Sequence, residues 1–143
     1  MIAITVDDER PMLKALTDIV GSSPDIEAVY DFSACTAALE WISSNSADVA
    51  FLDINMRGMG GLALAEKIAE SDMPMGVVAV TAADTMVTGQ NIGLLEEHFD
   101  RIMVTGSPES DGAKNIASQM KDLDKLTYIV DNPIENVNHI YTK

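Results

Sequence analysis

Short apolar runs alternate with longer segments of helical periodicity along most of this chain. The first, third and fourth runs are almost continuously apolar, as expected for strands that are covered on both faces. The second run alternates between apolar and polar residues, as an outer strand would. Five β-strands are therefore predicted, at residues 2–6, 26–30, 49–52, 76–80 and 101–104.

The segments between these strands have apolar residues at every third or fourth position, which predicts helices that bury one face. The first helix follows Pro11, a residue that suits the first turn, and stops near Gly21. The fourth is the weakest, because Thr88, Gly89 and Gly93 are poor helix formers. The five helices are predicted at about residues 11–21, 35–44, 62–69, 85–98 and 109–126.

Strands that alternate with helices predict βα units on a parallel sheet. We therefore expect an α/β protein with a doubly wound five-stranded parallel sheet and helices on both of its faces. A length of 143 residues with 47% hydrophobic content suits one compact domain with a single core.

The chain is strongly acidic, with a formal net charge of −14 from 23 acidic and 9 basic residues. This charge argues against nucleic acid as a direct partner, because such binding depends on Lys and Arg. The single Cys35 cannot close an intramolecular disulfide, which fits a reducing compartment. The sequence starts without the features of a signal peptide, and no apolar run approaches the ~18 residues of a membrane span. We expect a cytoplasmic protein without a membrane partner.

Polar residues directly follow three of the predicted strands: Asp7 and Asp8 the first, Asp53 the third and Thr81 the fourth. In open α/β sheets the functional site forms where the carboxyl ends of the strands meet. Carboxylates that converge there repel one another unless a cation is bound, and oxygen ligands without His or Cys favour Mg²⁺. The sequence therefore predicts a magnesium site at this edge of the sheet.

Each of these residues taken alone also has a structural explanation. Asp7 and Asp8 could cap the first helix, where the helix dipole stabilises acidic side chains. Asp53 could be an ordinary loop carboxylate, and Thr81 could be a strand residue that extends into a loop. Their joint placement at the ends of the correct strands favours the functional interpretation.

Four short motifs resemble those of the response-regulator receiver domains of two-component signalling. The motifs are Val6-Asp7-Asp8, Leu52-Asp53-Ile54-Asn55-Met56, Gly61-Leu62 and Val80-Thr81-Ala82. The resemblance covers about residues 1–83 and implies a flavodoxin-like receiver fold. It also implies a signalling phosphoacceptor rather than an enzyme, limited to self-phosphorylation and self-dephosphorylation, with a histidine kinase or phosphotransfer protein as the partner.

The resemblance implies a role for the acidic residues as well. Asp53 would be the phosphoacceptor. The cofactor would be Mg²⁺, bound directly by Asp8 and Asp53 and mainly through water by Asp7. The main-chain carbonyl of Asn55 would be the remaining protein ligand to the metal.

The later strands agree with the family pattern only in part. At the end of the fourth strand, the Thr81 hydroxyl would be the switch group and the Ala82 main-chain amide a second contact to the phosphoryl group. The family has a lysine followed by proline after the fifth strand, whereas here Ser107 stands at that place. Another alignment puts Asn132 there and requires a long insertion. The aromatic residue that moves with the switch threonine would fall near Val104.

These departures leave alternatives open. Without the lysine, the chain could be a pseudo-receiver that acts as a phosphorylation-independent protein-interaction module. Arg57, in the loop after Asp53, could supply part of the missing positive charge. A flavodoxin-like enzyme or nucleotide binder is disfavoured, because the first βα turn is acidic where a phosphate cradle needs glycines and free amides.

We assign residues 1–126 to the receiver domain and residues 127–143 to a C-terminal extension. Three roles are open for the extension: a sixth, edge strand, the start of a linker to an output domain, or a contact in a homodimer.

Overall fold

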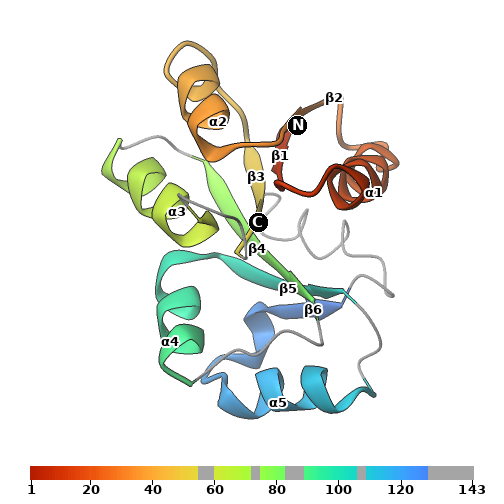
Figure 1. Cartoon of the computed structure of the whole chain (residues 1–143), viewed down its shortest axis with the longest axis vertical. Helices are drawn as coiled ribbons and strands as arrows, with labels where there is room; N and C mark the ends of the chain where they lie inside the picture. The colour runs from red at the N-terminus through yellow and green to blue at the C-terminus, as the bar shows by residue number, and fades with distance from the viewer. Residues whose placement is uncertain (55–59, 72–74, 83–88, 106–108, 129–143) are drawn as a thin grey trace. The chain divides into compact units, whose positions relative to one another are not determined.

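The computed structural model of the protein describes residues 1–54, 60–71, 75–82, 89–105 and 109–128 (Figure 1). Within these residues the chain forms six β-strands, five α-helices and one short 3₁₀ helix. It separates into two compact units, residues 1–77 and residues 78–143.

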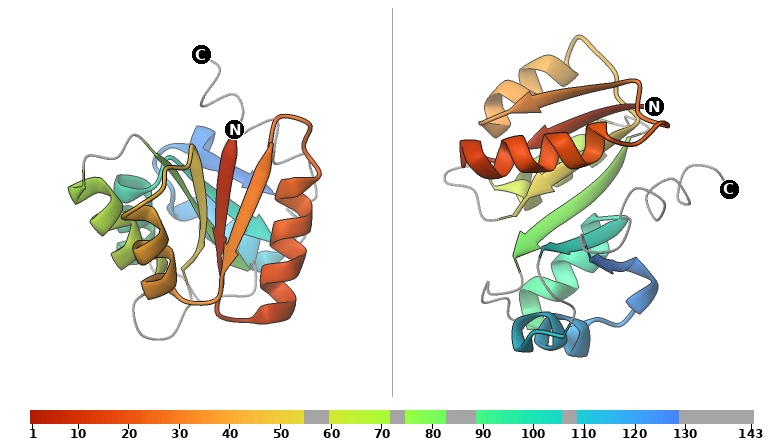
Figure 2. Two further views of the ribbon diagram at one scale, coloured as in Figure 1. Left: turned by 90° about the horizontal axis from the view of Figure 1, so that it is seen from above. Right: turned by 90° about the vertical axis from the view of Figure 1, so that its right-hand side faces the viewer.

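The first unit contains three strands and three helices: β1 (Ile2–Val6), α1 (Arg10–Gly21), β2 (Ala28–Phe32), α2 (Cys35–Ile42), β3 (Val49–Asp53) and α3 (Gly61–Glu70). Strand β1 lies between β2 and β3, and all three are parallel. Helix α1 packs on one face of β1 and β2, and α2 packs on the other (Figure 2). Helix α3 lies beside α2 and contacts β3.

Helix α1 illustrates how the apolar periodicity produces this packing. Its buried residues, Leu13, Leu16 and Val20, recur at intervals of three and four positions and face the strands. The hydroxyl of Thr17 lies 2.8 Å from that of Thr5, a fully buried residue of β1. The helix therefore satisfies a buried polar group of the sheet as well as covering apolar surface.

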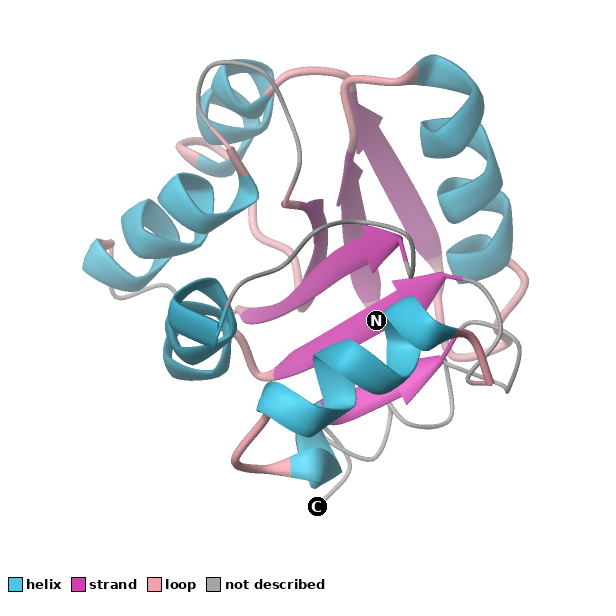
Figure 3. Ribbon diagram, turned by 60° about the horizontal axis from the view of Figure 1, so that its bottom comes forward, coloured by secondary structure: helices cyan, strands magenta, loops and turns pink. Residues whose placement is uncertain are grey.

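The second unit contains most of β4 (Gly76–Ala82), followed by α4 (Gly89–His98), β5 (Arg101–Thr105), α5 (Asp111–Gln119), the 3₁₀ helix (Leu123–Lys125) and β6 (Leu126–Tyr128). Strand β5 lies between β4 and β6, and the three strands are parallel (Figure 3). Their register places Thr81, Val104 and Tyr128 in one row across the strands.

The strand order β2-β1-β3-β4-β5-β6 confirms the predicted fold class. The first five strands have the order of a flavodoxin-like receiver fold, and β2 is an outer strand as its alternating sequence indicated. The second strand begins two residues later than predicted, at Ala28, because its pairing with β1 starts opposite Ile2. Residues 85–88 of the predicted fourth helix lie outside the described residues.

The fifth helix ends at Gln119, well before the predicted residue 126. Met120 has an extended backbone, with φ −83° and ψ 140°, and so leaves the helix. The next two amides, of Lys121 and Asp122, donate to the Glu96 side chain instead of continuing the helical ladder. The chain then forms β6, so the sixth strand is the role observed for the start of the extension.

Candidate functional site

Three predicted acidic residues meet at the carboxyl ends of β1 and β3. The two strands are adjacent and in register, with Val6 opposite Leu52, so Asp7 and Asp53 follow at neighbouring positions. One carboxylate oxygen from each of Asp7, Asp8 and Asp53 can be chosen so that all three lie within 4.8 Å of one another. The structure therefore brings together the acidic cluster that the sequence indicated.

Asp7 is the most buried of the three, with 6% of its surface exposed, whereas Asp8 and Asp53 are half-buried. Burial is the main reason why the pKa of Asp7 rises from its ordinary 3.8 to about 6. The Glu9 amide opposes this rise by donating to Asp7 Oδ1 at 2.9 Å. The Asp53 carboxylate, through its charge and a hydrogen bond, and the charge of Asp8 raise the pKa further. The cluster thus favours a bound proton or a bound cation.

The hydrogen bonds around Asp7 also test the helix-capping explanation. The N-cap position of α1 belongs to Glu9, whose side chain makes no capping hydrogen bond. Asp7 holds the turn before the helix through the Glu9 amide, and its own amide donates to the Phe32 carbonyl at 3.1 Å. Asp7 is therefore fixed between the end of β2 and the start of α1 rather than serving as the cap.

Gly61 explains how the backbone of Asp53 is packed. A Cβ atom at Gly61 would lie 2.5 Å from the Asp53 carbonyl oxygen and 3.1 Å from its carbonyl carbon. The first residue of α3 must therefore lack a side chain for the helix to start this close to the end of β3. Gly61 was singled out in the sequence only by resemblance, and the close approach gives its physical reason.

Cys35 is a neighbour of the cluster that the sequence did not reveal. It is the first residue of α2 and is 4% exposed. Burial, followed by the charges of Asp8 and Asp53, raises the pKa of its thiol to about 11. Because only the thiolate is a good metal ligand, this residue leaves the site to oxygen ligands at neutral pH.

The other predicted site residues fall in the second unit or outside the described residues. Thr81 is in β4 and is 2% exposed, and Ala82 ends the same strand. Asn55, which was predicted to offer a carbonyl to the metal, lies outside the described residues, as do Arg57, Ser107 and Asn132.

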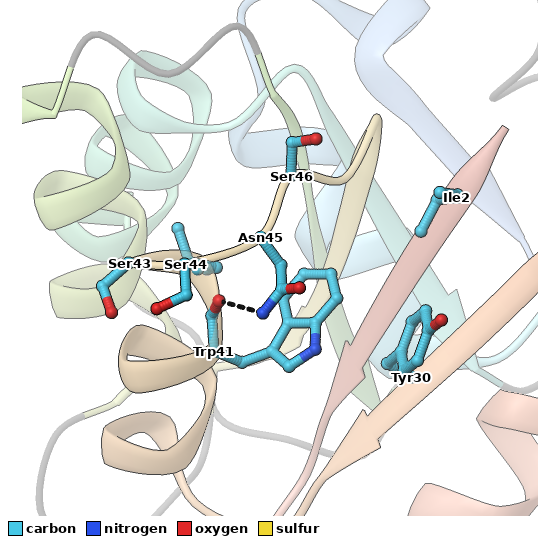
Figure 4. Close-up of a pocket in the computed structure, with 8 residues that line it drawn as sticks. Ile2, Tyr30, Trp41, Ser43, Ser44, Asn45 and Ser46 are labelled. Carbon is cyan, nitrogen blue, oxygen red and sulfur yellow. Dashed lines mark hydrogen bonds between the residues drawn. The ribbon is translucent and has the colours of Figure 1, made fainter.

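A hollow of about 590 Å³ lies elsewhere in the first unit, beside the start of β1 and the end of α2 (Figure 4). The rings of Tyr30 and Trp41 are 4.9 Å apart beside it, and the Asn45 side-chain amide donates to the Trp41 carbonyl at 2.9 Å. Its lining residues include neither a carboxylate nor a cationic side chain. It is therefore unrelated to the charge chemistry of the acidic cluster.

Comparison with known protein families agrees with the class of protein that the fold and the acidic cluster indicate. Residues 3–100 match the family described as "Response regulator receiver domain". The chain belongs to this family, which makes it a two-component signalling module rather than a conventional enzyme. Among the described residues, no helix has the length and apolar character needed to cross a membrane.

Several relatives are response regulators or contain similar segments. An uncharacterised response regulatory protein of Yersinia pestis is 37% identical over 101 residues, covering 70% of this chain and 40% of that protein. A protein-glutamate methylesterase/protein-glutamine glutaminase of Dechloromonas aromatica is 27% identical over 125 residues, covering 84% of this chain and 33% of that protein. The chain thus spans less than half the length of these relatives.

Solved structures show the same fold. The response regulator domain of Thermotoga maritima CheB has a TM-score of 0.65 at 20% identity, with 96% of each chain covered. The isolated REC domain of RcsB from Salmonella enterica serovar Typhimurium, solved with the phosphomimetic BeF₃⁻, has a TM-score of 0.67 at 15% identity. That similarity covers 81% of this chain and 97% of the RcsB domain.

Proposed function

We propose that this chain is a phosphoacceptor that takes a phosphoryl group from a histidine kinase or phosphotransfer protein onto Asp53. The observation that supports this most strongly is the convergence of the Asp7, Asp8 and Asp53 carboxylates within 4.8 Å. Family membership supports the class of donor, because receiver domains are phosphorylated by histidine kinases.

The three carboxylates have the chemistry of a Mg²⁺ site, since they offer clustered oxygen ligands and excess negative charge. In this proposal, Asp8 and Asp53 would bind the ion directly, Asp7 would bind it mainly through water, and the Asn55 main-chain carbonyl would add a ligand. Asp7 suits the indirect role, because it is the most buried of the three and already accepts the Glu9 amide. When bound, the ion would neutralise charge on the acceptor and on the phosphoryl oxygens.

Asp53 acts as the nucleophile in the transfer step. One of its carboxylate oxygens forms a bond to the phosphorus of a phosphohistidine, in line with the phosphorus–nitrogen bond that breaks. The bonding electrons leave with the imidazole nitrogen, and the product is an aspartyl phosphate. Half-burial of the side chain leaves it within reach of a donor, while the packing of Gly61 against its backbone fixes its position.

The contacts to the transferred group are proposed to come from the end of β4. The Thr81 hydroxyl and the Ala82 main-chain amide donate to phosphoryl oxygens, as the family resemblance implies. Where the family has a lysine, Ser107 cannot provide a cation. One charge-assisted hydrogen bond worth about 1.5–3 kcal/mol is therefore missing, and we expect slower phosphoryl transfer than in a lysine-containing receiver.

Intact-mass measurement after incubation with a small phosphodonor and Mg²⁺ tests the acceptor directly. We expect the wild-type chain to gain one phosphoryl mass and Asp53→Asn to gain none. Asp18→Asn is the matched control, because Asp18 is an exposed residue of α1 paired with Lys14 at 3.1 Å. A phosphoryl mass that persists in Asp53→Asn, or that never forms in the wild type, would contradict the proposal.

The absent lysine supports a second candidate, a pseudo-receiver that binds a partner without phosphorylation. This candidate predicts one affinity for the partner, whether the chain is untreated, treated with phosphodonor or carries Asp53→Asn. This candidate would be excluded if phosphodonor treatment changed the affinity of the wild-type chain for the partner but left the affinity of Asp53→Asn unchanged.

A further inference from the structure

Residues 121–128, here called the β6 segment, are tied to helix α4 by the side chain of Glu96. The Lys121 amide lies 3.0 Å from each carboxylate oxygen of Glu96, and the Asp122 amide lies 2.8 Å from one of them. Hydrogen bonds to an ionised acceptor are stronger than those between neutral groups. A single side chain of α4 therefore holds the chain where it leaves α5.

Further hydrogen bonds tie the same segment to the end of α4 and the start of β5. The Lys125 ammonium donates to the Glu96 carbonyl at 2.6 Å and reaches the Phe99 carbonyl at 3.5 Å. These carbonyls are at the C-terminal end of the helix, where a cation is favoured. The Arg101 guanidinium of β5 donates to the Asp124 carbonyl at 3.0 Å.

Strand β6 is short, with three residues, and pairs only with β5 among the described strands. Most of the hydrogen bonds that hold the segment are solvent-exposed, which places it among the elements that open at low cost. Its register also places Tyr128 in the same row as Val104 and Thr81, two strands away. The segment is therefore weakly held and lies in line with the strand position proposed to contact the phosphoryl group.

We propose that the β6 segment is the output element of this receiver, docked on α4 and β5 in the unmodified chain and loosened when Asp53 accepts a phosphoryl group. This inference rests on the proposed function of Asp53. The proposed direction is release, because exposed hydrogen bonds such as those that hold the segment open at low cost. Linkage then predicts that a substitution that weakens the docking also strengthens binding at the acceptor site, up to the factor by which docking weakens that binding.

The first test uses Mg²⁺ with BeF₃⁻, a mimic of the phosphoryl group, on the full 143-residue chain. Fluorine NMR reports whether BeF₃⁻ is bound, and hydrogen exchange reports protection of the amides of residues 121–128. We expect bound BeF₃⁻ to accelerate exchange in this segment. Bound BeF₃⁻ with unchanged or slower exchange there overturns the inference and leaves the proposed function intact.

The second test weakens the docking by substitution instead of by ligand binding. Glu96→Gln removes the charge that binds the Lys121 and Asp122 amides, and Glu97→Gln makes the same change at the next residue of α4, which is exposed. We expect Glu96→Gln to accelerate exchange without ligand and to tighten BeF₃⁻ binding roughly threefold or more. Glu97→Gln should change neither by more than about twofold.

Lys125→Gln removes the ammonium contacts to α4 and should shift both measurements in the same direction as Glu96→Gln. Unchanged or weaker BeF₃⁻ binding in both variants overturns the inference, and so does unchanged exchange in both. If fluorine NMR detects no bound BeF₃⁻ in the wild type and no phosphoryl mass forms, the proposed function fails and this inference fails with it.

Discussion

At the residue scale, the acidic cluster contains a carboxyl group whose burial opposes its ionisation. Asp7 is almost fully buried beside two other carboxylates, and its pKa of about 6 means that at neutral pH it ionises at a cost. Perturbed pKa values of this kind are frequent at functional sites. The free-energy cost of ionising Asp7 is therefore a measurable property of the site.

This cost predicts how pH affects the stability of the protein without bound metal. Because the pKa of Asp7 is higher in the folded chain than its ordinary 3.8, its contribution to stability is complete below pH 3.8 and is lost as pH rises through about 6. Asp7→Asn keeps an oxygen for the Glu9 amide and removes the charge. We expect it to raise the free energy of unfolding at about pH 7.5 by on the order of 2 kcal/mol, measured by urea denaturation with chelator present.

The gain from Asp7→Asn should shrink toward pH 5, where the wild-type side chain is mostly protonated. Asp18→Asn, at an exposed position, should change stability by less than about 0.5 kcal/mol at either pH. Equal stability of wild type and Asp7→Asn at both pH values would show that the buried charge carries no cost.

The sequence could place Asp7, Asp8 and Asp53 because they stand at or just after the ends of two strands, and adjacent parallel strands bring these ends together. It could not show which of them is most buried, because burial depends on how α1 and β2 close around the turn after β1. The proximity of the Cys35 thiol to the cluster was also beyond sequence analysis. That proximity depends on where α2 starts, and the thiol's raised pKa follows from packing.

At the element scale, one close contact sets the position of helix α3. Gly61 begins the helix with room for hydrogen only, since a Cβ would lie 2.5 Å from the Asp53 carbonyl oxygen. That contact is with backbone, which cannot turn aside as a flexible side chain can. The start of the helix and the end of β3 are therefore fixed against each other.

Gly61→Ala should consequently destabilise the protein and disturb the acceptor. We expect a loss of about 1–3 kcal/mol in the free energy of unfolding, together with weaker Mg²⁺ binding, because α3 must shift away from Asp53. Gly93→Ala is the matched control: a Cβ at this exposed position of α4 meets nothing within 4 Å, so the variant should gain about 0.5–1 kcal/mol. Destabilisation of similar size in both variants would mean that the contact with Asp53 is not the cause.

Element boundaries show where sequence patterns stop being informative. The apolar periodicity of the last predicted helix continues past Met120. The helix nevertheless ends there, because the next two amides donate to Glu96, which belongs to a helix earlier in the sequence. A tertiary hydrogen bond of this kind leaves no local trace in the sequence. The short strand β6 was foreseen only as one of three alternatives for the same reason.

At the scale of the whole molecule, the net charge of −14 acts on folding as well as on binding. Self-repulsion of so many acidic groups destabilises a compact state, and dissolved salt screens it. We therefore expect any dissolved cation to stabilise this protein to some extent. A specific metal site has to be distinguished from this general effect.

Comparison of Mg²⁺ with NaCl at equal ionic strength makes that distinction. Both salts should stabilise the protein by screening. Mg²⁺ should add about 1–3 kcal/mol to the free energy of unfolding once its concentration exceeds the dissociation constant ten- to hundredfold. Chelation should remove only this additional part. Asp8→Asn should lose the additional part and keep the response to NaCl, because it removes one ligand of the cluster and leaves the remaining surface charge in place. If Mg²⁺ and matched NaCl stabilise the wild type equally, the three carboxylates bind no ion specifically under these conditions.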